Sequence, residues 1–199
     1  MFTGIINNIG VVTSVSDNLL SINTENKIFK NIDTGTSVSV DGVCLTLKSI
    51  EGDNIDFQIS NESINRSIIK NYKKDSYVNL ETPVTANDFL SGHIVQGHVD
   101  EVAKVIDIIE QANNLWEFKF SSNNSKYLVD KGSVTINGVS LTTNRPNDSE
   151  FTVAVIEETY KRTNFQYLDT GSQVNIEYDI LSKYVERLIN DNWYWNNNN

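Results

Sequence analysis

Short segments in which apolar and polar residues alternate recur along most of the chain, and they predict β-strands rather than helices. Two of these segments flank an Asp41-Gly42 pair, and two others flank an Asn137-Gly138 pair. Both residues of such a pair tolerate positive φ, which makes the pairs strong signals for tight hairpins. The strands predicted in this way cover residues 38–40, 43–47, 57–59, 77–80, 116–120, 134–136, 139–142, 151–156 and 174–178.

An internal repeat divides these strands into two halves. Residues 36–46 and 132–142 match at six of eleven positions with an offset of 96, and the same offset aligns Arg66 with Arg162. A period near half the chain length is longer than the 20–50 residues of solenoid repeats, so it indicates a duplicated domain. Because closed barrels protect strand edges, we expect an all-β protein with two tandem duplicated barrels, residues 1–86 and 87–179.

Residues 180–199 lie outside the repeat and predict one amphipathic helix. Its apolar residues recur at helical spacing, at Ile180, Leu181, Tyr184, Val185, Leu188, Ile189 and Trp193. Two interpretations of this stripe remain open: it packs on the chain's own barrels, or it joins copies of the chain.

The composition narrows the function classes. Hydrophobic residues make up 39% of the 199 residues, enough for a core, and the net charge of −10 argues against nucleic-acid or anionic-membrane partners. No apolar run approaches the ~20 residues of a spanning helix, and the N-terminus does not read as a signal peptide. Cys44 is the one cysteine, so an intramolecular disulfide and a thiolate-rich metal site are excluded. We therefore expect a cytoplasmic protein.

Candidate chemistry centres on a few polar residues near the middle of the chain. His93 and His98 are the only histidines, with Asp100 nearby. A metal site is disfavoured, because their spacing places the two side chains on opposite faces of a strand and a third ligand is missing. Structural hydrogen bonding and a role in proton transfer or ligand contact both remain open.

The repeat also pairs Cys44 with Ser140. A lone cysteine in a strand is commonly a small buried hydrophobe. Here, however, it is in register with a hydroxyl and is followed by Thr46, as Ser140 is followed by Thr142. This pattern suggests two related pockets lined by small polar groups, suited to a flat heteroaromatic ligand with a sugar-like tail.

Taken together, these motifs resemble the riboflavin synthase family of the α-chain type. The resemblance runs from Met1 to about Leu188, and it is carried by Met1-Phe2-Thr3-Gly4-Ile5, the doubled VDGVCLT and INGVSLT segments, SGHIVQGHVD at 91–100 and Lys131-Gly132. It implies two Greek-key barrels and a C-terminal helix that assembles a homotrimer. It also implies a reaction without metal or organic cofactor, in which one 6,7-dimethyl-8-ribityllumazine donates a four-carbon unit to another. The products are riboflavin and 5-amino-6-(D-ribitylamino)uracil, and each active site lies between the N-terminal barrel of one subunit and the C-terminal barrel of its neighbour.

The resemblance also implies which residues form the site. Catalytic roles fall on Ser37, Cys44, His98, Ser140 and Asp179. Substrate contacts are expected in the N-terminal barrel from Gly4, Ile5, Ile6, Cys44, Leu45, Thr46, Ser60, Asn61, Glu62, Ser63, Ile64 and Asn65, and in the C-terminal barrel from Ser140, Leu141, Thr142, Ile156, Glu157, Glu158, Thr159, Tyr160 and Lys161. Gly97, His98 and Val99 match a further binding segment, Lys131 a residue that reaches a neighbour's ligand, and Phe2 a segment that closes the site.

The two pockets should differ, since one lumazine donates the four-carbon unit and the other accepts it. Cys44 against Ser140 is one such difference. A second follows from matching residues 4–7 with 93–96, at an offset of 89, which places Ile9 at the repeat position of His98.

Two other functions compete with the enzyme. A non-catalytic, antenna-type lumazine-binding protein is similar to this family, but such proteins depart at the cysteine position and around the second histidine motif, whereas Cys44 and His98 are present here. A duplicated interaction module without a ligand is disfavoured by the glycine, hydroxyl and histidine groups paired in the two halves.

Overall fold

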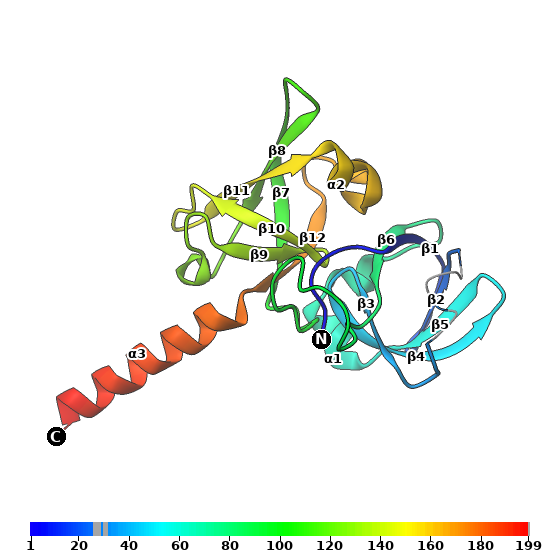
Figure 1. Cartoon of the computed structure of the whole chain (residues 1–199), viewed down its shortest axis with the longest axis horizontal. Helices are drawn as coiled ribbons and strands as arrows, with labels where there is room; N and C mark the ends of the chain where they lie inside the picture. The colour runs from blue at the N-terminus through cyan, green and yellow to red at the C-terminus, as the bar shows by residue number, and fades with distance from the viewer. Residues whose placement is uncertain (26–28, 30–31, 199) are drawn as a thin grey trace.

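Two β-barrels in tandem, followed by one long helix, make up the computed structural model, which describes residues 1–25, 29 and 32–198, with the side chains of 191–198 excepted (Figure 1). The strands of the first half are β1 (Asn8–Val15), β2 (Leu19–Asn23), β3 (Ser37–Val40), β4 (Val43–Glu51), β5 (Asn54–Gln58) and β6 (Tyr77–Glu81). Those of the second half are β7 (Glu101–Gln111), β8 (Leu115–Ser121), β9 (Ser133–Ile136), β10 (Val139–Asn144), β11 (Glu150–Ile156) and β12 (Gln173–Tyr178). The helices are α1 (Asn61–Arg66), η2 (Ile68–Asn71), η3 (Ser125–Tyr127), α2 (Glu157–Arg162), η4 (Asn164–Tyr167) and α3 (Ile180–Asn198).

Both barrels are closed and share one topology. The strand order is β1-β2-β5-β4-β3-β6 in the first barrel, and the second repeats it as β7-β8-β11-β10-β9-β12. In each, three hairpin-connected strands are joined by a longer connection to a strand that pairs beside the first of them, which is a Greek-key arrangement. The predicted fold class is therefore confirmed.

The two hairpin turns at the Asp-Gly and Asn-Gly pairs form as predicted. Asp41 and Gly42 have φ of 46° and 76°, and Asn137 and Gly138 have φ of 45° and 79°. These turns meet at the barrel–barrel interface, where a Cβ on Gly42 would lie 2.8 Å from the backbone nitrogen of Gly138. Each glycine is therefore required by the close approach as well as by the turn.

A buried polar cluster joins the barrels around these turns. Asn79 Nδ2 donates to the carbonyl of Asn137 at 2.8 Å, and Asn175 Nδ2 donates to the carbonyl of Asp41, also at 2.8 Å. Asn164 adds a bond from its backbone nitrogen to Asn79 Oδ1 at 2.7 Å. Because buried amides left unpaired are costly, this cluster fixes how one barrel sits against the other.

The chain also exchanges short segments between the barrels. Ile6, from the N-terminal segment, packs in the core of the second barrel, while Val99, which precedes β7, packs in the core of the first. The two segments run antiparallel where they meet, with Phe2 and Val95 exchanging backbone hydrogen bonds of 2.8 and 3.1 Å. The core of the first barrel is thus completed by a residue that precedes the strands of the second barrel, and the core of the second by a residue that precedes the strands of the first.

The C-terminal helix is present as predicted, and it projects away from both barrels (Figure 1). Leu181, Tyr184, Val185, Leu188 and Ile189 are 54–63% exposed, so within one chain the apolar stripe does not cover the barrels. Trp193, also assigned to this stripe, lies outside the described side chains.

Candidate active site

Two pockets related by the repeat lie on the outer faces of the barrels. The first is lined by Val43, Cys44, Ser60, Glu62, Ser63, Arg66, Ser67, Gly97, His98, Val99 and Asp100, and the second by Gly4, Ile5, Ile6, Val139, Ser140, Glu158, Thr159, Arg162 and Thr163. Every residue of the second pocket has a counterpart in the first, at an offset of 96 or, for the exchanged segments, of 93. Their volumes differ, about 450 Å³ against about 170 Å³.

The exchanged segments form one wall of each pocket. The backbone nitrogen of Cys44 donates to the carbonyl of Gly97 at 2.9 Å, and that of Ser140 donates to the carbonyl of Gly4 at 2.8 Å. Gly97 and Gly4 both have positive φ, and a Cβ on Gly97 would lie 2.7 Å from Cys44 Cβ. Only glycine permits this approach of segment to strand.

This geometry corrects two expectations from the sequence. Gly4, Ile5 and Ile6 were expected in the N-terminal barrel's pocket, but they line the pocket of the C-terminal barrel. The offset of 89 was also wrong, because Gly4 corresponds to Gly97 in structure. The counterpart of His98 is therefore Ile5 and not Ile9, although the difference between the two pockets remains.

A short helix forms the opposite wall of each pocket. Ser60 caps α1 by accepting the backbone N–H of Ser63 at 3.1 Å, whereas Ile156 stands at the same place before α2. On each helix an arginine pairs with the glutamate one turn earlier, Arg66 with Glu62 at 3.2 Å and Arg162 with Glu158 at 2.5 Å. Each pocket therefore carries one charge pair at its rim.

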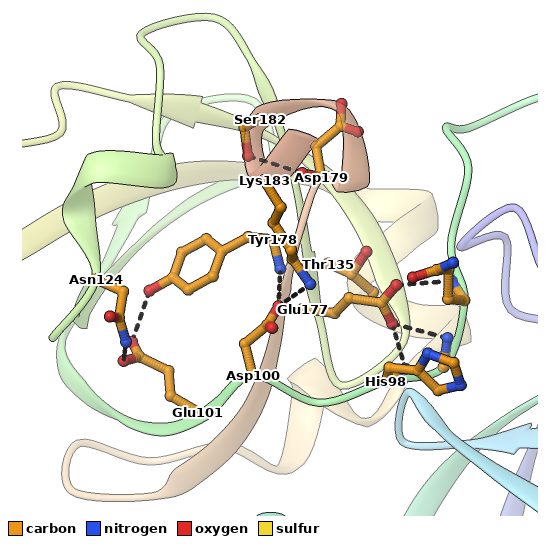
Figure 2. A network of polar contacts seen from close by, with 12 residues as sticks. His98, Asp100, Glu101, Asn124, Thr135, Glu177, Tyr178, Asp179, Ser182 and Lys183 are labelled. Carbon is orange, nitrogen blue, oxygen red and sulfur yellow. Dashed lines mark hydrogen bonds and ion pairs between the residues drawn. The ribbon is translucent and has the colours of Figure 1, made fainter. Parts of the chain in front are cut away.

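His98 and Asp100 bring charged and titratable groups to the larger pocket. The His98 backbone is held by Glu177 of β12, and Asp100 pairs with Lys183 of α3 at 2.5 Å (Figure 2). The smaller pocket has Ile5 and Ile6 where the larger has His98 and Val99. Only the larger pocket therefore has an imidazole in its lining.

His93 contacts the smaller pocket through Ser140. Its Nδ1 lies 2.7 Å from Ser140 Oγ, and its Nε2 lies 3.1 Å from Thr135 Oγ1. Burial lowers the pKa of His93, so its imidazole is neutral near pH 7. The hydroxyl of Ser140 thus has a neutral imidazole as its partner.

Several expected site residues line the pockets, and others lie elsewhere. Cys44, Ser60, Glu62, Ser63, Gly97, His98, Val99, Ser140, Glu158 and Thr159 are all in a pocket lining. Leu45 and Leu141 point into the barrel cores, as strand alternation requires, while Thr46 and Thr142 are exposed on the same outer face as Cys44 and Ser140. Ser37 pairs with Thr46 across β3 and β4.

The remaining candidates have local structural roles. Asp179 Oδ1 accepts the backbone N–H of Leu181 at 3.0 Å and so caps α3, and Phe2 is fully buried. On α1, Ile64 packs on the first core while Asn61 and Asn65 are exposed. On α2, Tyr160 stacks on Trp116 with ring centroids 4.0 Å apart, and Lys161 pairs with Glu157. Ile156 is exposed beside this helix.

Lys131 has an unusual backbone. Its φ is +66°, whereas Gly35 stands at the same position of the first half with φ of +89°. The left-handed region is uncommon for lysine, and the repeat shows the same exchange at Asp75, with φ of +71°, and Gly171, with φ of +92°.

The sequence interpretation missed seven lining residues, which are Val43, Arg66, Ser67, Asp100, Val139, Arg162 and Thr163. The offset of 96 that aligned Arg66 with Arg162 also aligns Glu62 with Glu158, and the spacing of four residues within each pair is the available signal. Within the described residues, no group of three or more His, Cys, Asp or Glu could hold a metal ion, and no helix is long and apolar enough to cross a membrane.

Comparison with known proteins agrees with this geometry. The model of the lumazine binding domain family matches residues 3–83 and again residues 96–179. The chain is 35% identical to the riboflavin synthase of Actinobacillus pleuropneumoniae over 95% of this chain and 90% of that protein, and 34% identical to that of Schizosaccharomyces pombe over 95% and 94%. Among solved structures, LumP complexed with riboflavin superposes with a TM-score of 0.82 at 26% identity, covering 89% of this chain and 99% of LumP. The chain belongs to the lumazine-binding domain family, and it carries that domain twice.

Proposed function

We propose that this protein is a riboflavin synthase. It takes two molecules of 6,7-dimethyl-8-ribityllumazine, transfers a four-carbon unit from one to the other, and releases riboflavin and 5-amino-6-(D-ribitylamino)uracil. The observation that carries this proposal is the pair of matched but unequal pockets, because a dismutation needs two copies of one substrate held in different environments. The riboflavin synthases that match 95% of the chain support it.

Proximity is the main contribution expected of the protein. Holding two lumazines face to face replaces a bimolecular encounter by an intramolecular one. The first chemical step removes a proton from the C7 methyl group of one lumazine, which the electron-poor ring already makes acidic. His98 is the proposed proton carrier, because it brings an imidazole to the lining of the larger pocket beside Cys44.

We propose that the two pockets meet between subunits of a homotrimer. The exposed apolar face of α3 would provide the contact between subunits, and Lys131 would reach the ligand of a neighbour. Ser37, Asp179 and Phe2 are proposed to act near this junction. A cytoplasmic location is proposed as well, since the sequence has a single cysteine and so no intramolecular disulfide.

The experiment that tests this function is incubation of the pure protein with 6,7-dimethyl-8-ribityllumazine alone. We expect riboflavin, followed by its absorbance, at half the molar amount of lumazine consumed. Failure to bind lumazine would overturn both the enzyme and any lumazine-binding function.

A second candidate is a lumazine-binding protein without turnover. The likeness to LumP complexed with riboflavin and with 6,7-dimethyl-8-(1'-D-ribityl) lumazine, at TM-scores of 0.82 and 0.80, favours it. Cys44 and His98 in the larger pocket favour the enzyme. Tight binding with altered fluorescence and no riboflavin formation would decide for this second candidate.

A further inference from the structure

Two buried glutamates stand at equivalent positions where the barrels exchange segments. Glu81 ends β6 and Glu177 lies near the end of β12, and they are 2% and 3% exposed. Neither forms an ion pair among the described residues, and both instead accept hydrogen bonds from backbone N–H groups. Burying a carboxylate costs free energy of desolvation unless hydrogen-bond donors compensate it. The donors that each glutamate contacts therefore indicate its role.

Glu177 holds the segment that contains His98. Its Oε1 accepts the backbone N–H of Gln96 at 2.6 Å, and its Oε2 accepts those of Gly97 and His98 at 2.8 and 2.9 Å (Figure 2). Three consecutive amides therefore converge on one carboxylate. Hydrogen bonds to an ionised acceptor are shorter and about twice as strong as neutral ones.

Glu81 does the same for the N-terminal segment. Its Oε1 accepts the backbone N–H of Thr3 at 2.7 Å and the Thr3 hydroxyl at 2.9 Å, and its Oε2 accepts the backbone N–H of Gly4 at 3.0 Å. The two carboxylates are thus related by the repeat in their contacts as well as in their sequence positions.

Each glutamate belongs to one barrel and shapes the pocket of the other. Glu177 is in the second barrel, yet the Gly97 and His98 that it holds line the first barrel's pocket. Glu81 is in the first barrel, yet the Gly4 that it holds lines the second barrel's pocket. A glutamate of the opposite barrel therefore fixes the position of the backbone segment that lines each pocket.

The charge of Glu177 is supported from the C-terminal helix. Burial raises the pKa of Glu177, while the three amides and, more weakly, the nearby Lys183 act in the opposite direction. Lys183 also pairs with Asp100, a lining residue of the larger pocket, and Asp100 Oδ2 accepts the backbone N–H of Tyr178 at 2.8 Å (Figure 2). The start of α3 is in this way connected to the His98 segment.

We propose that Glu177 and Glu81 are positioning residues, each holding the ligand-facing segment of the opposite barrel's pocket through backbone amides, and that Glu177 acts through His98. The part that concerns catalysis rests on the proposed function. A glutamine at either place would keep the shape but lose the charge, and its amide group would face N–H donors that need an acceptor.

The test compares Glu177→Gln and Glu81→Gln in the full-length protein, with Glu101→Gln as the matched control. Glu101 is also buried, at 9% exposure, but its carboxylate accepts the backbone N–H of Asn123 and the Tyr178 hydroxyl and no backbone N–H of either exchanged segment. Hydrogen exchange of the backbone amides is measured without ligand. E177Q should speed exchange at Gly97 and His98 about tenfold or more, and E81Q should do so at Thr3 and Gly4. E101Q should change neither segment.

The catalytic part is tested by a double-mutant cycle on kcat/KM for riboflavin formation. If Glu177 acts through His98, the loss caused by E177Q should largely disappear in a His98→Gln background. Additive losses, or exchange at Gly97 and His98 that E177Q leaves unchanged, would overturn the proposal. If E177Q does not fold, Glu177→Asp keeps the charge one methylene farther away, and it should show the same local increase in exchange. A wild-type protein without lumazine turnover would overturn the proposed function, while the exchange data would still decide whether the glutamates hold the segments.

Discussion

At the scale of single residues, the pockets depend on contacts that only particular side chains permit. Cys44 and Ser140 lie at matched positions, and each donates its backbone N–H to a glycine of an exchanged segment. Their other surroundings differ, because Ser140 has a neutral His93 as a partner and Cys44 shares its pocket with His98. The asymmetry that a donor and an acceptor require is therefore present in a few side chains on an otherwise repeated backbone.

Substitution of Gly97 by alanine should damage the larger pocket. A Cβ there would lie 2.7 Å from Cys44 Cβ and 2.9 Å from Cys44 N, so the segment must move. Beyond the strain of positive φ, we expect a destabilisation of about 1–3 kcal/mol, as for other overpacked sites, and weaker riboflavin binding. Urea unfolding and fluorescence titration measure the two effects.

Gly35→Ala is the matched control for this prediction. Gly35 also has positive φ, at 89°, but a Cβ there would meet nothing within 4 Å. The Gly35→Ala variant should therefore lose only the stability that an alanine at positive φ costs. Equal losses in the two variants would mean that the close approach to Cys44 has no energetic role.

Replacement of His98 by glutamine tests the proposed proton carrier. The side chain is exposed, so we expect the free energy of unfolding to stay within about 0.5 kcal/mol of wild type. Loss of a proton-transfer group should lower kcat by about 10²-fold or more. Steady-state kinetics with lumazine measure this, and an unchanged kcat would assign the proton transfer to another group or to water.

At the scale of elements, α3 is the clearest case of a surface without a partner in its own chain. Its apolar stripe is exposed along the described side chains, while Lys183 and Lys126 fix its start through ion pairs with Asp100 and, from η3, with Glu186. A helix held at one end and apolar along its length is suited to packing against copies of itself.

If the proposed trimer forms through α3, the double substitution Val185→Glu and Leu188→Glu should dissociate it to monomers. Each change places a charge on the apolar stripe, and both residues are more than half exposed, so the barrels should remain folded. Analytical ultracentrifugation gives the oligomeric state, and circular dichroism checks the fold. A control at the exposed Arg187, Arg187→Gln, should keep the wild-type mass. An unchanged mass for the double variant would exclude α3 as the contact between subunits.

At the scale of the whole molecule, Asp41 is a buried acid within the polar cluster that joins the barrels. Burial raises the pKa of Asp41 to about 7, although Asn79, Tyr72 and Asn164 all donate hydrogen bonds to its carboxylate. Asn137 occupies the matched position of the second half, so the fold itself shows that an asparagine is compatible with this turn. The contact between the barrels at Asp41 is therefore sensitive to pH.

Asp41→Asn should remove this sensitivity. The folded protein binds the Asp41 proton more tightly than the unfolded chain, so the wild-type free energy of unfolding should decrease as the pH rises from about 4 to about 7. The limit of this effect is about 4 kcal/mol, and we expect the variant to be more stable than wild type at pH 8 by on the order of 1–2 kcal/mol. Urea unfolding at pH 5 and pH 8 measures the difference, and an equal pH dependence in both proteins would contradict the assignment to Asp41.

Much of this architecture could be predicted from the order of residues alone. Local alternation, the Asp-Gly and Asn-Gly turns and the offset of 96 gave two matched all-β halves, because a duplicated pattern of strands and turns forms the same unit twice. The helix at 180–198 followed from its periodicity in the same way. The strands β1, β2 and β7 were not predicted, because the turns that join β1 to β2 and β7 to β8 contain no Asp-Gly or Asn-Gly pair. The turn after β7 is instead formed by Asn113 and Asn114, which have φ of 64° and 53°.

What only the tertiary structure decided is which barrel each segment completes. Residues 1–7 precede the first barrel and residues 93–99 precede the second, so chain order assigns each to its own half. The structure places each on the other barrel, because Gly4 and Gly97 approach Ser140 and Cys44 closely and because Glu81 and Glu177 offer buried acceptors to their amides. These are contacts between residues about 50 to 140 positions apart, and no local pattern encodes them. The sequence by itself thus determined the two repeated units and the polar groups of the site, and long-range packing determined how the two units share their pockets.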